Sequence, residues 1–60
     1  MNSQMSLVEI IAAGVFEHNG HEWKLESDNL GWVLYCDGAL HRQYCIRSGV
    51  AADIKKDIGL

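Results

Sequence analysis

The dipeptide Asn19-Gly20 constrains the fold of this chain more than any other feature of its sequence. Both residue types tolerate the positive φ of a type I′ turn, and a two-residue turn of this kind joins two antiparallel strands. Such a turn also fixes the strand register, with residue 18 opposite 21, 17 opposite 22 and 16 opposite 23. The sequence therefore predicts a β-hairpin centred on residues 19–20 and an antiparallel sheet around it.

Side chains alternate between the two faces of this predicted hairpin. One face carries mainly apolar and imidazole groups, namely Phe16, His18, His21, Trp23 and Leu25. The other face carries Glu17, Glu22, Lys24 and Glu26. Because Glu17 and Glu22 lie directly opposite each other, their like charges repel and lower the stability of the hairpin. We expect the first face to belong to the core and the second to be an acidic surface.

A continuous apolar run, residues 32–36, follows a turn at residues 27–31 and predicts a third strand. A strand that is apolar on both faces is normally covered on both faces. The dipeptide Asp37-Gly38 marks a second hairpin, and residues 39–47 alternate as a fourth strand would, with Leu40, Arg42, Tyr44 and Ile46 on one face. A helix remains the alternative for residues 39–47, so the sheet has three or four strands.

Helices are predicted on either side of the sheet in the sequence. Ser6 and Glu9 form a capping-box pattern, and Gly14 is placed to end a helix over about residues 6–13. Ser48 is a suitable N-cap for a second helix. The apolar stripe of that helix consists of Val50, Ala51, Ile54 and Ile58, and Lys55 and Lys56 point outward near its C-terminal end.

These elements predict one small α+β domain over residues 1–60, in which an antiparallel meander is flanked by an N-terminal and a C-terminal helix. This order resembles that of the double-stranded RNA-binding domain. The resemblance lies in element order alone, because Ser48-Gly49-Val50-Ala51 opens the last helix where a lysine cluster would be needed. No residue roles follow from it.

The length of 60 residues disfavours an enzyme. A chain of this size buries roughly 60% of the surface of its unfolded form, and a pocket of about 300 Å³ would occupy much of its single core. Cys36 and Cys45 lie near His41 in the sequence, as a nucleophile and base would. However, the sequence shows no oxyanion hole, phosphate-binding loop or paired carboxylates to accompany them. We therefore expect a protein without catalytic residues or cofactors.

Five side chains of the kinds that bind zinc occur in the sequence: His18, His21, Cys36, His41 and Cys45. Their spacing differs from that of zinc ribbons and knuckles, so the sequence predicts no structural metal and leaves binding of an ion by these residues open. The apolar stretch near the N-terminus is interrupted by Glu9 and is too short to span a bilayer. We expect a cytoplasmic, membrane-free protein with free thiols.

The net charge of −3 conceals a difference between two parts of the chain. Residues 1–41 hold six of the eight acidic side chains and one of the five basic ones. Residues 42–60 are basic, through Arg42, Arg47, Lys55 and Lys56. Because nucleic-acid binders need a basic excess, nucleic acid is not the expected partner of the chain as a whole. These four residues give the alternative function, a small repressor that binds nucleic acid.

The preferred hypothesis is a small non-enzymatic regulator or inhibitor that binds another protein. Its partner-binding residues would be Glu17, Glu22 and Glu26, which suit a basic, nucleic-acid-binding groove. Size and charge fit a phage- or plasmid-type inhibitor of a nuclease or defence complex. The strand over residues 32–36 needs cover on both faces, which predicts a homodimer or partner surface at Trp32, Val33 and Tyr35.

Overall fold

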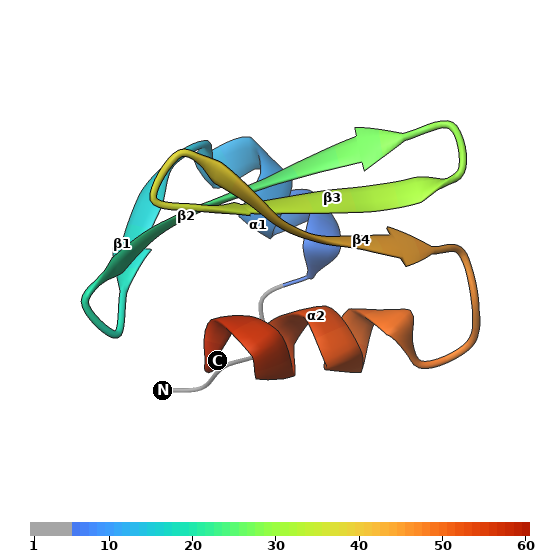
Figure 1. The fold of residues 1–60 in the computed structure, drawn as a ribbon. Coiled ribbons are helices and arrows are strands. Elements are labelled where there is room, and N and C mark those ends of the chain that lie inside the picture. The colour runs from blue at the N-terminus through green and yellow to red at the C-terminus, as the bar shows by residue number, and fades with distance from the viewer. Residues whose placement is uncertain (1–5) are drawn as a thin grey trace.

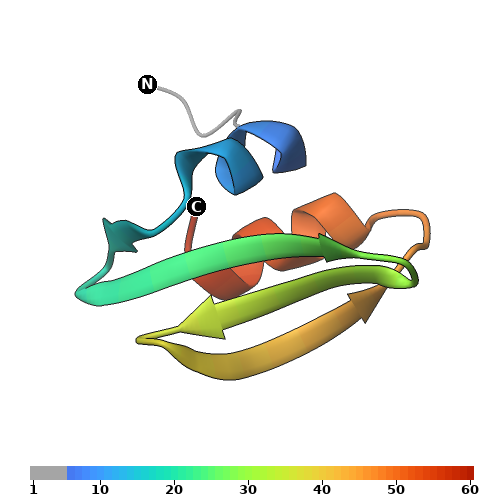
Figure 2. The same cartoon turned by 90° about the horizontal axis from the view of Figure 1, so that it is seen from above.

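The computed structural model describes residues 6–60 as one α+β domain, which confirms the predicted fold class. Its elements are α1 (Leu7–Ala13), β1 (Phe16–His18), β2 (His21–Asp28), β3 (Gly31–Cys36), β4 (Ala39–Cys45) and α2 (Val50–Ile58). The strands form one four-stranded antiparallel sheet in the order β1-β2-β3-β4. Both helices lie on the same side of this sheet (Figures 1 and 2), so the other side has no helix over it.

Both predicted two-residue turns are present and lie at the same end of the sheet (Figure 1). Asn19 and Gly20 have φ values of 55° and 82°, and Asp37 and Gly38 have φ values of 53° and 83°. Positive φ at both central residues is the requirement of a type I′ turn. The register between β1 and β2 matches the prediction, and Glu17 faces Glu22.

The third turn, between β2 and β3, brings two backbone segments unusually close together. Gly31 begins β3 with a φ of 154° and is buried. A Cβ atom at this position would lie 1.8 Å from the backbone carbonyl oxygen of Tyr44 on β4. Only glycine fits here, because backbone on the neighbouring strand occupies the space that a side chain needs.

The segment that follows the Asp37-Gly38 turn is a strand, so the helical alternative for residues 39–47 is wrong. Its predicted alternation is interrupted by a bulge. Leu34 pairs with Arg42, whereas the next residue, Tyr35, pairs with Leu40, so His41 is the extra residue on β4. A bulge moves the following side chains to the other face. Leu40 consequently lies on the opposite face from Arg42, and not on the same face as predicted.

Helix α1 begins with the predicted capping box. The Ser6 hydroxyl accepts from the Glu9 backbone N–H at 3.2 Å, and the Ser6 N–H donates to Glu9 Oε1 at 2.8 Å. The predicted cap of α2 is wrong, because Gly49 is the N-cap residue and no side chain caps this helix. Its three buried residues, Val50, Ile54 and Ile58, lie four apart on one stripe. Packing of that stripe on the sheet stabilises α2 in the absence of a cap.

The core lies between the helices and one face of the sheet. It consists of Ile10, Trp23, Leu25, Leu34, Tyr44, Val50, Ile54 and Ile58. Phe16, Trp32 and Cys36 are partly buried and pack against it. The distribution confirms that Trp23 and Leu25 of the predicted apolar face belong to the core, with Phe16 packed against it. The prediction is wrong for His21, which is exposed at the start of β2, and the acidic face lies outside.

Candidate functional site

The side of the sheet without helices is the first candidate site, and we call it the open face. The strand register assigns to it every second residue of β2 and β3, with Glu17 from β1. On β4 the bulge leaves Leu40 and Gln43, three residues apart, on this face. Its central members are Glu17, Glu22, Lys24, Glu26, Val33, Tyr35, Leu40 and Gln43. The two helices cover only the opposite side (Figure 2), so among residues 6–60 no helix shields these side chains from solvent.

The three residues predicted as a dimer or partner surface do not share one face. Trp32 lies on the helix side, where it pairs with Tyr44 and packs against the core. Val33 and Tyr35 lie on the open face and are half-buried by their neighbours on β2 and β4. The apolar part of a binding surface therefore centres on Val33 and Tyr35, and Trp32 is part of the domain interior.

The acidic residues predicted to bind a partner are brought together on the open face. Glu17 and Glu22 face each other across β1 and β2, and Glu26 lies further along β2. Lys24 lies between Glu22 and Glu26, and its Nζ is 3.0 Å from a carboxylate oxygen of Glu26. Glu22, Lys24 and Glu26 line a shallow hollow of about 260 Å³, and Glu17 does not. Three carboxylates against one ammonium group give this surface a negative charge.

Two apolar residues extend this surface beyond the set that the sequence predicted. Leu40 is 57% exposed and pairs with Tyr35 on the open face, and Val15 is 60% exposed and lines the hollow. Sequence reasoning missed Leu40, because simple alternation along β4 places it with Tyr44 in the core. Only the bulge at His41 turns it outward.

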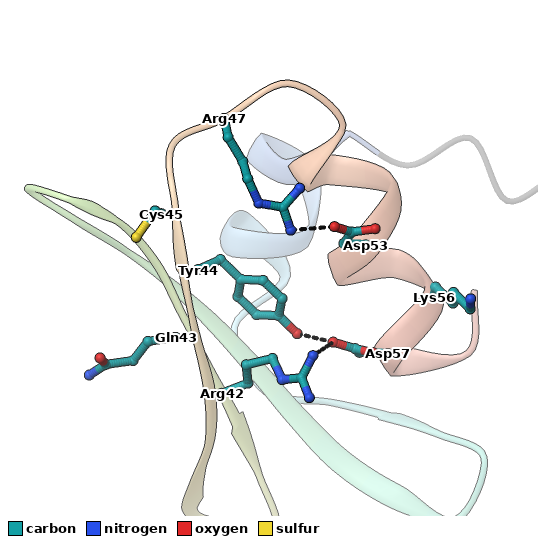
Figure 3. A pocket seen from close by; sticks show the side chains of 8 residues that line it. All are labelled: Arg42, Gln43, Tyr44, Cys45, Arg47, Asp53, Lys56 and Asp57. Carbon is teal, nitrogen blue, oxygen red and sulfur yellow. Dashed lines mark hydrogen bonds and ion pairs between the residues drawn. The ribbon is translucent and has the colours of Figure 1, made fainter.

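The basic residues of the alternative site surround a second hollow, of about 700 Å³, between β4 and α2. Figure 3 shows that Arg42 and Arg47 reach from the β4 side toward α2 and meet its aspartates. Arg42 pairs with Asp57 at 3.4 Å, and Arg47 pairs with Asp53. A phosphate bound here would compete with these carboxylates for both guanidinium groups. Of the predicted basic set, Lys56 also lines the hollow, and Lys55 does not.

Tyr44, a core residue, bonds to the same aspartate that pairs with Arg42. It is 7% exposed, and its hydroxyl donates a hydrogen bond to Asp57 Oδ2 at 2.5 Å, as Figure 3 shows. Burial, together with this bond to a carboxylate, raises the pKa of Tyr44 well above its usual range. The hydroxyl therefore remains protonated at neutral pH and ties β4 to α2.

We expect Tyr44→Phe to lower the free energy of unfolding by about 1–2 kcal/mol at neutral pH, because it removes a hydrogen bond to a charged acceptor. Since the folded-state pKa lies above the unfolded-state value, the wild-type contribution is present below about pH 10 and is lost as the pH rises further. Urea unfolding of both proteins from pH 7 to 11 measures the difference. A difference that stays constant above pH 10 would contradict this account.

The sheet end that carries the two type I′ turns brings three potential ligands together. His21 Nδ1 lies 2.8 Å from Asp37 Oδ2, and Cys36 Sγ lies 3.8 Å from the same oxygen. Asp37 was not among the predicted candidates. His21 and Cys36 were, but their proximity depends on the register of β2 with β3, which the sequence does not specify.

The other predicted candidate ligands lie apart from this group. His18 Nε2 hydrogen-bonds to the carbonyl oxygen of Gly59, and His41 packs edge-to-face with Trp23 at a ring-centroid distance of 5.5 Å. Cys45 is exposed at the opposite end of β4 from the Asp37-Gly38 turn. Both cysteines are free thiols.

Cys36 does not have the electrostatics of an activated nucleophile. Desolvation raises the pKa of its thiol, and the adjacent Asp37 carboxylate raises it further. The pKa of Asp37 itself is lowered, first by the backbone N–H of Glu22 and then by His21. A reactive cysteine needs a lowered thiol pKa, and this environment has the opposite effect.

Two findings concern the chain more broadly. Within residues 6–60, no helix is long and apolar enough to cross a membrane. No protein-family model, curated protein or solved structure matches the chain.

Proposed function

We propose that this protein is a non-enzymatic interaction module, a regulator or inhibitor whose open face binds a basic surface on another protein. The observation that carries the proposal is the composition of that face: half-buried Val33 and Tyr35 lie beside Glu17, Glu22 and Glu26, on the side of the sheet opposite both helices. An apolar centre with a charged rim is the usual anatomy of a protein interface.

The negative charge of the open face favours binding of a basic protein over binding of a second copy of this chain. Two copies of the open face would bring glutamates against glutamates, and like charges across an interface cost several kcal/mol. A groove lined with lysine and arginine, such as a nucleic-acid-binding groove, offers complementary charge. The homodimer remains an outcome that sedimentation of the wild-type protein would reveal.

The alternative function, nucleic-acid binding through the basic C-terminal third, has weaker geometric support. Arg42 and Arg47 are already paired with aspartates of α2, so their charges are partly compensated within the protein. Two lysines and two compensated arginines give few phosphate contacts, and each contact contributes to the salt dependence of such binding.

The test uses a basic protein that the wild-type chain captures and that added DNA releases from the complex. The measured quantity is the rate at which this partner associates with each variant. We expect Glu17→Gln with Glu22→Gln and Glu26→Gln to slow association about tenfold or more at low salt, because long-range attraction is lost. Lys24→Gln, which removes the cation of this face, should accelerate association. The fold should tolerate all four changes, since the triple variant relieves the repulsion between Glu17 and Glu22.

Lys55→Gln with Lys56→Gln is the matched control on the other side of the molecule, and it should leave the association rate unchanged. If this control slows association and the triple glutamate variant does not, the basic residues of the segment 42–60 form the binding surface. If the wild-type protein sediments as a dimer that the triple variant alters, the open face binds a second copy. Either result overturns the proposal.

A further inference from the structure

His21, Cys36 and Asp37 form a cluster that the proposed function does not use. His21 begins β2, and Cys36 and Asp37 stand at the end of β3 and in the turn that follows it. Their ligating atoms, one nitrogen, one sulfur and one oxygen, all lie within 4.8 Å of one another. The contacts of His21 and Cys36 converge on the same oxygen, Asp37 Oδ2.

The backbone presets the position of the Asp37 carboxylate. Its other oxygen, Oδ1, accepts the backbone N–H of Glu22 at 3.0 Å, and the Asp37 N–H donates to the Glu22 carbonyl oxygen at 2.7 Å. The positive φ of Asp37 in the type I′ turn belongs to the same arrangement. Metal-ligating carboxylates are typically held by such outer hydrogen bonds while a second oxygen faces the ion.

We infer that His21 Nδ1, Cys36 Sγ and Asp37 Oδ2 bind one zinc ion, with the fourth coordination position open to water or to a group from a partner. An imidazole, a thiolate and a carboxylate are all established zinc ligands, and a set that includes sulfur and nitrogen disfavours Ca²⁺ and Mg²⁺. The ion displaces the thiol proton of Cys36 to solvent, and the imidazole binds in its neutral form. One thiolate and one carboxylate then balance the two positive charges of Zn²⁺.

The cluster needs only a small adjustment to hold the ion. Neighbouring ligand atoms in a tetrahedral site lie about 3.5 Å apart, given bond lengths of about 2.0–2.3 Å. The 2.8 Å between His21 Nδ1 and Asp37 Oδ2 must therefore widen by about 0.5–0.7 Å, and a separation at the 4.8 Å limit must close by about 1.3 Å. Because a backbone hydrogen bond holds the Asp37 carboxylate, the adjustment falls to the His21 side chain, which is 53% exposed and can rotate. The same exposure gives the ion a path from solvent.

This site is distinct from a structural metal centre, which is the kind of site that the ligand spacing disfavours. The buried core contains none of the three ligands, although Cys36 packs against its edge, so the metal-free protein remains folded. EDTA should therefore remove the ion without unfolding the chain. Added zinc should raise the thermal midpoint of the metal-free protein, because the ion binds the folded state preferentially.

The experiment titrates metal-free protein with Zn²⁺ by calorimetry and with Co²⁺ by absorption spectroscopy. We expect one ion per chain and a thiolate-to-cobalt charge-transfer band. Cys36→Ser should abolish that band and weaken zinc binding by at least about tenfold, and His21→Asn should weaken it similarly. Cys45→Ser is the matched control, because it removes the other free thiol, and it should bind as the wild type does.

Circular dichroism of each metal-free variant establishes that it is folded before the titration. The inference is overturned if the folded wild-type protein binds no zinc at about 100 μM. This concentration is about ten times a dissociation constant of about 10 μM, so even a weak site would be nearly saturated. The inference is equally overturned if Cys36→Ser retains the cobalt band, or if Cys45→Ser loses it. None of these results depends on whether the open face binds a basic protein.

Discussion

Gly31→Ala is expected to lower the free energy of unfolding by about 3 kcal/mol or more, which corresponds to a fall in Tm of roughly 12–24 °C for a domain of this size. The added Cβ would lie 1.8 Å from the Tyr44 carbonyl oxygen, and that oxygen belongs to backbone that cannot rotate away. Either β3 or β4 must shift at the place where the two strands pair. Since a domain of 60 residues has a total stability of only ~3–9 kcal/mol, much of the protein would be unfolded.

Gly38→Ala separates the effect of this clash from that of backbone strain. Gly38 also has a positive φ, of 83°, but a Cβ there would meet no atom within 4 Å. Its replacement should cost only about 1–2 kcal/mol, the penalty for an L-residue in left-handed geometry. Thermal and urea unfolding of the two variants measure the contrast, and similar losses from both would show that the approach of β3 to β4 does not limit stability.

The second large effect is expected at Leu34 and Tyr35, which are adjacent in β3 but lie on opposite faces of the sheet. Leu34→Glu places a carboxylate at a fully buried position in the core, where an unpaired charge costs several kcal/mol, so this variant should be unfolded. Tyr35→Glu places the same group on the open face, directly opposite Lys24. The cross-strand charge pair compensates in part, and this variant should fold with a loss of about 1 kcal/mol.

Circular dichroism and sedimentation of both variants test this contrast. If Tyr35→Glu unfolds as Leu34→Glu does, the face that carries Tyr35 is covered in the native protein, and a second copy is the natural cover. If both variants fold, the assignment of the two faces of β3 is wrong.

Local sequence signals predicted most of the fold because they act within a few residues. Asn19-Gly20 and Asp37-Gly38 each specify a turn through the φ values that they permit, and the first of them set the β1–β2 register. The capping box of Ser6 and Glu9 likewise depends on one turn of helix. The α+β class and the division of the hairpin into an acidic and an apolar face followed from these signals.

The parts of the candidate sites that sequence could not predict depend on contacts between distant segments. A continuous apolar run such as residues 32–36 has no alternation, so it does not show that Trp32 faces the helices while Val33 and Tyr35 face outward. The bulge at His41, which moves Leu40 to the open face, has no local signature in the sequence. The meeting of His21 with Asp37 requires the β2–β3 register as well.

The central claim is that the open face is the binding surface, and NMR cross-saturation from the captured partner to the methyl groups of this protein tests it most directly. Methyl groups report on both candidate surfaces: Val33 and Leu40 lie on the open face, and Ile46, which is 68% exposed, directly precedes Arg47 in the chain. We predict saturation transfer to the methyl groups of Val33 and Leu40 and none to Ile46. Transfer to Ile46 that leaves Val33 and Leu40 unaffected would contradict the account and assign binding to the basic side.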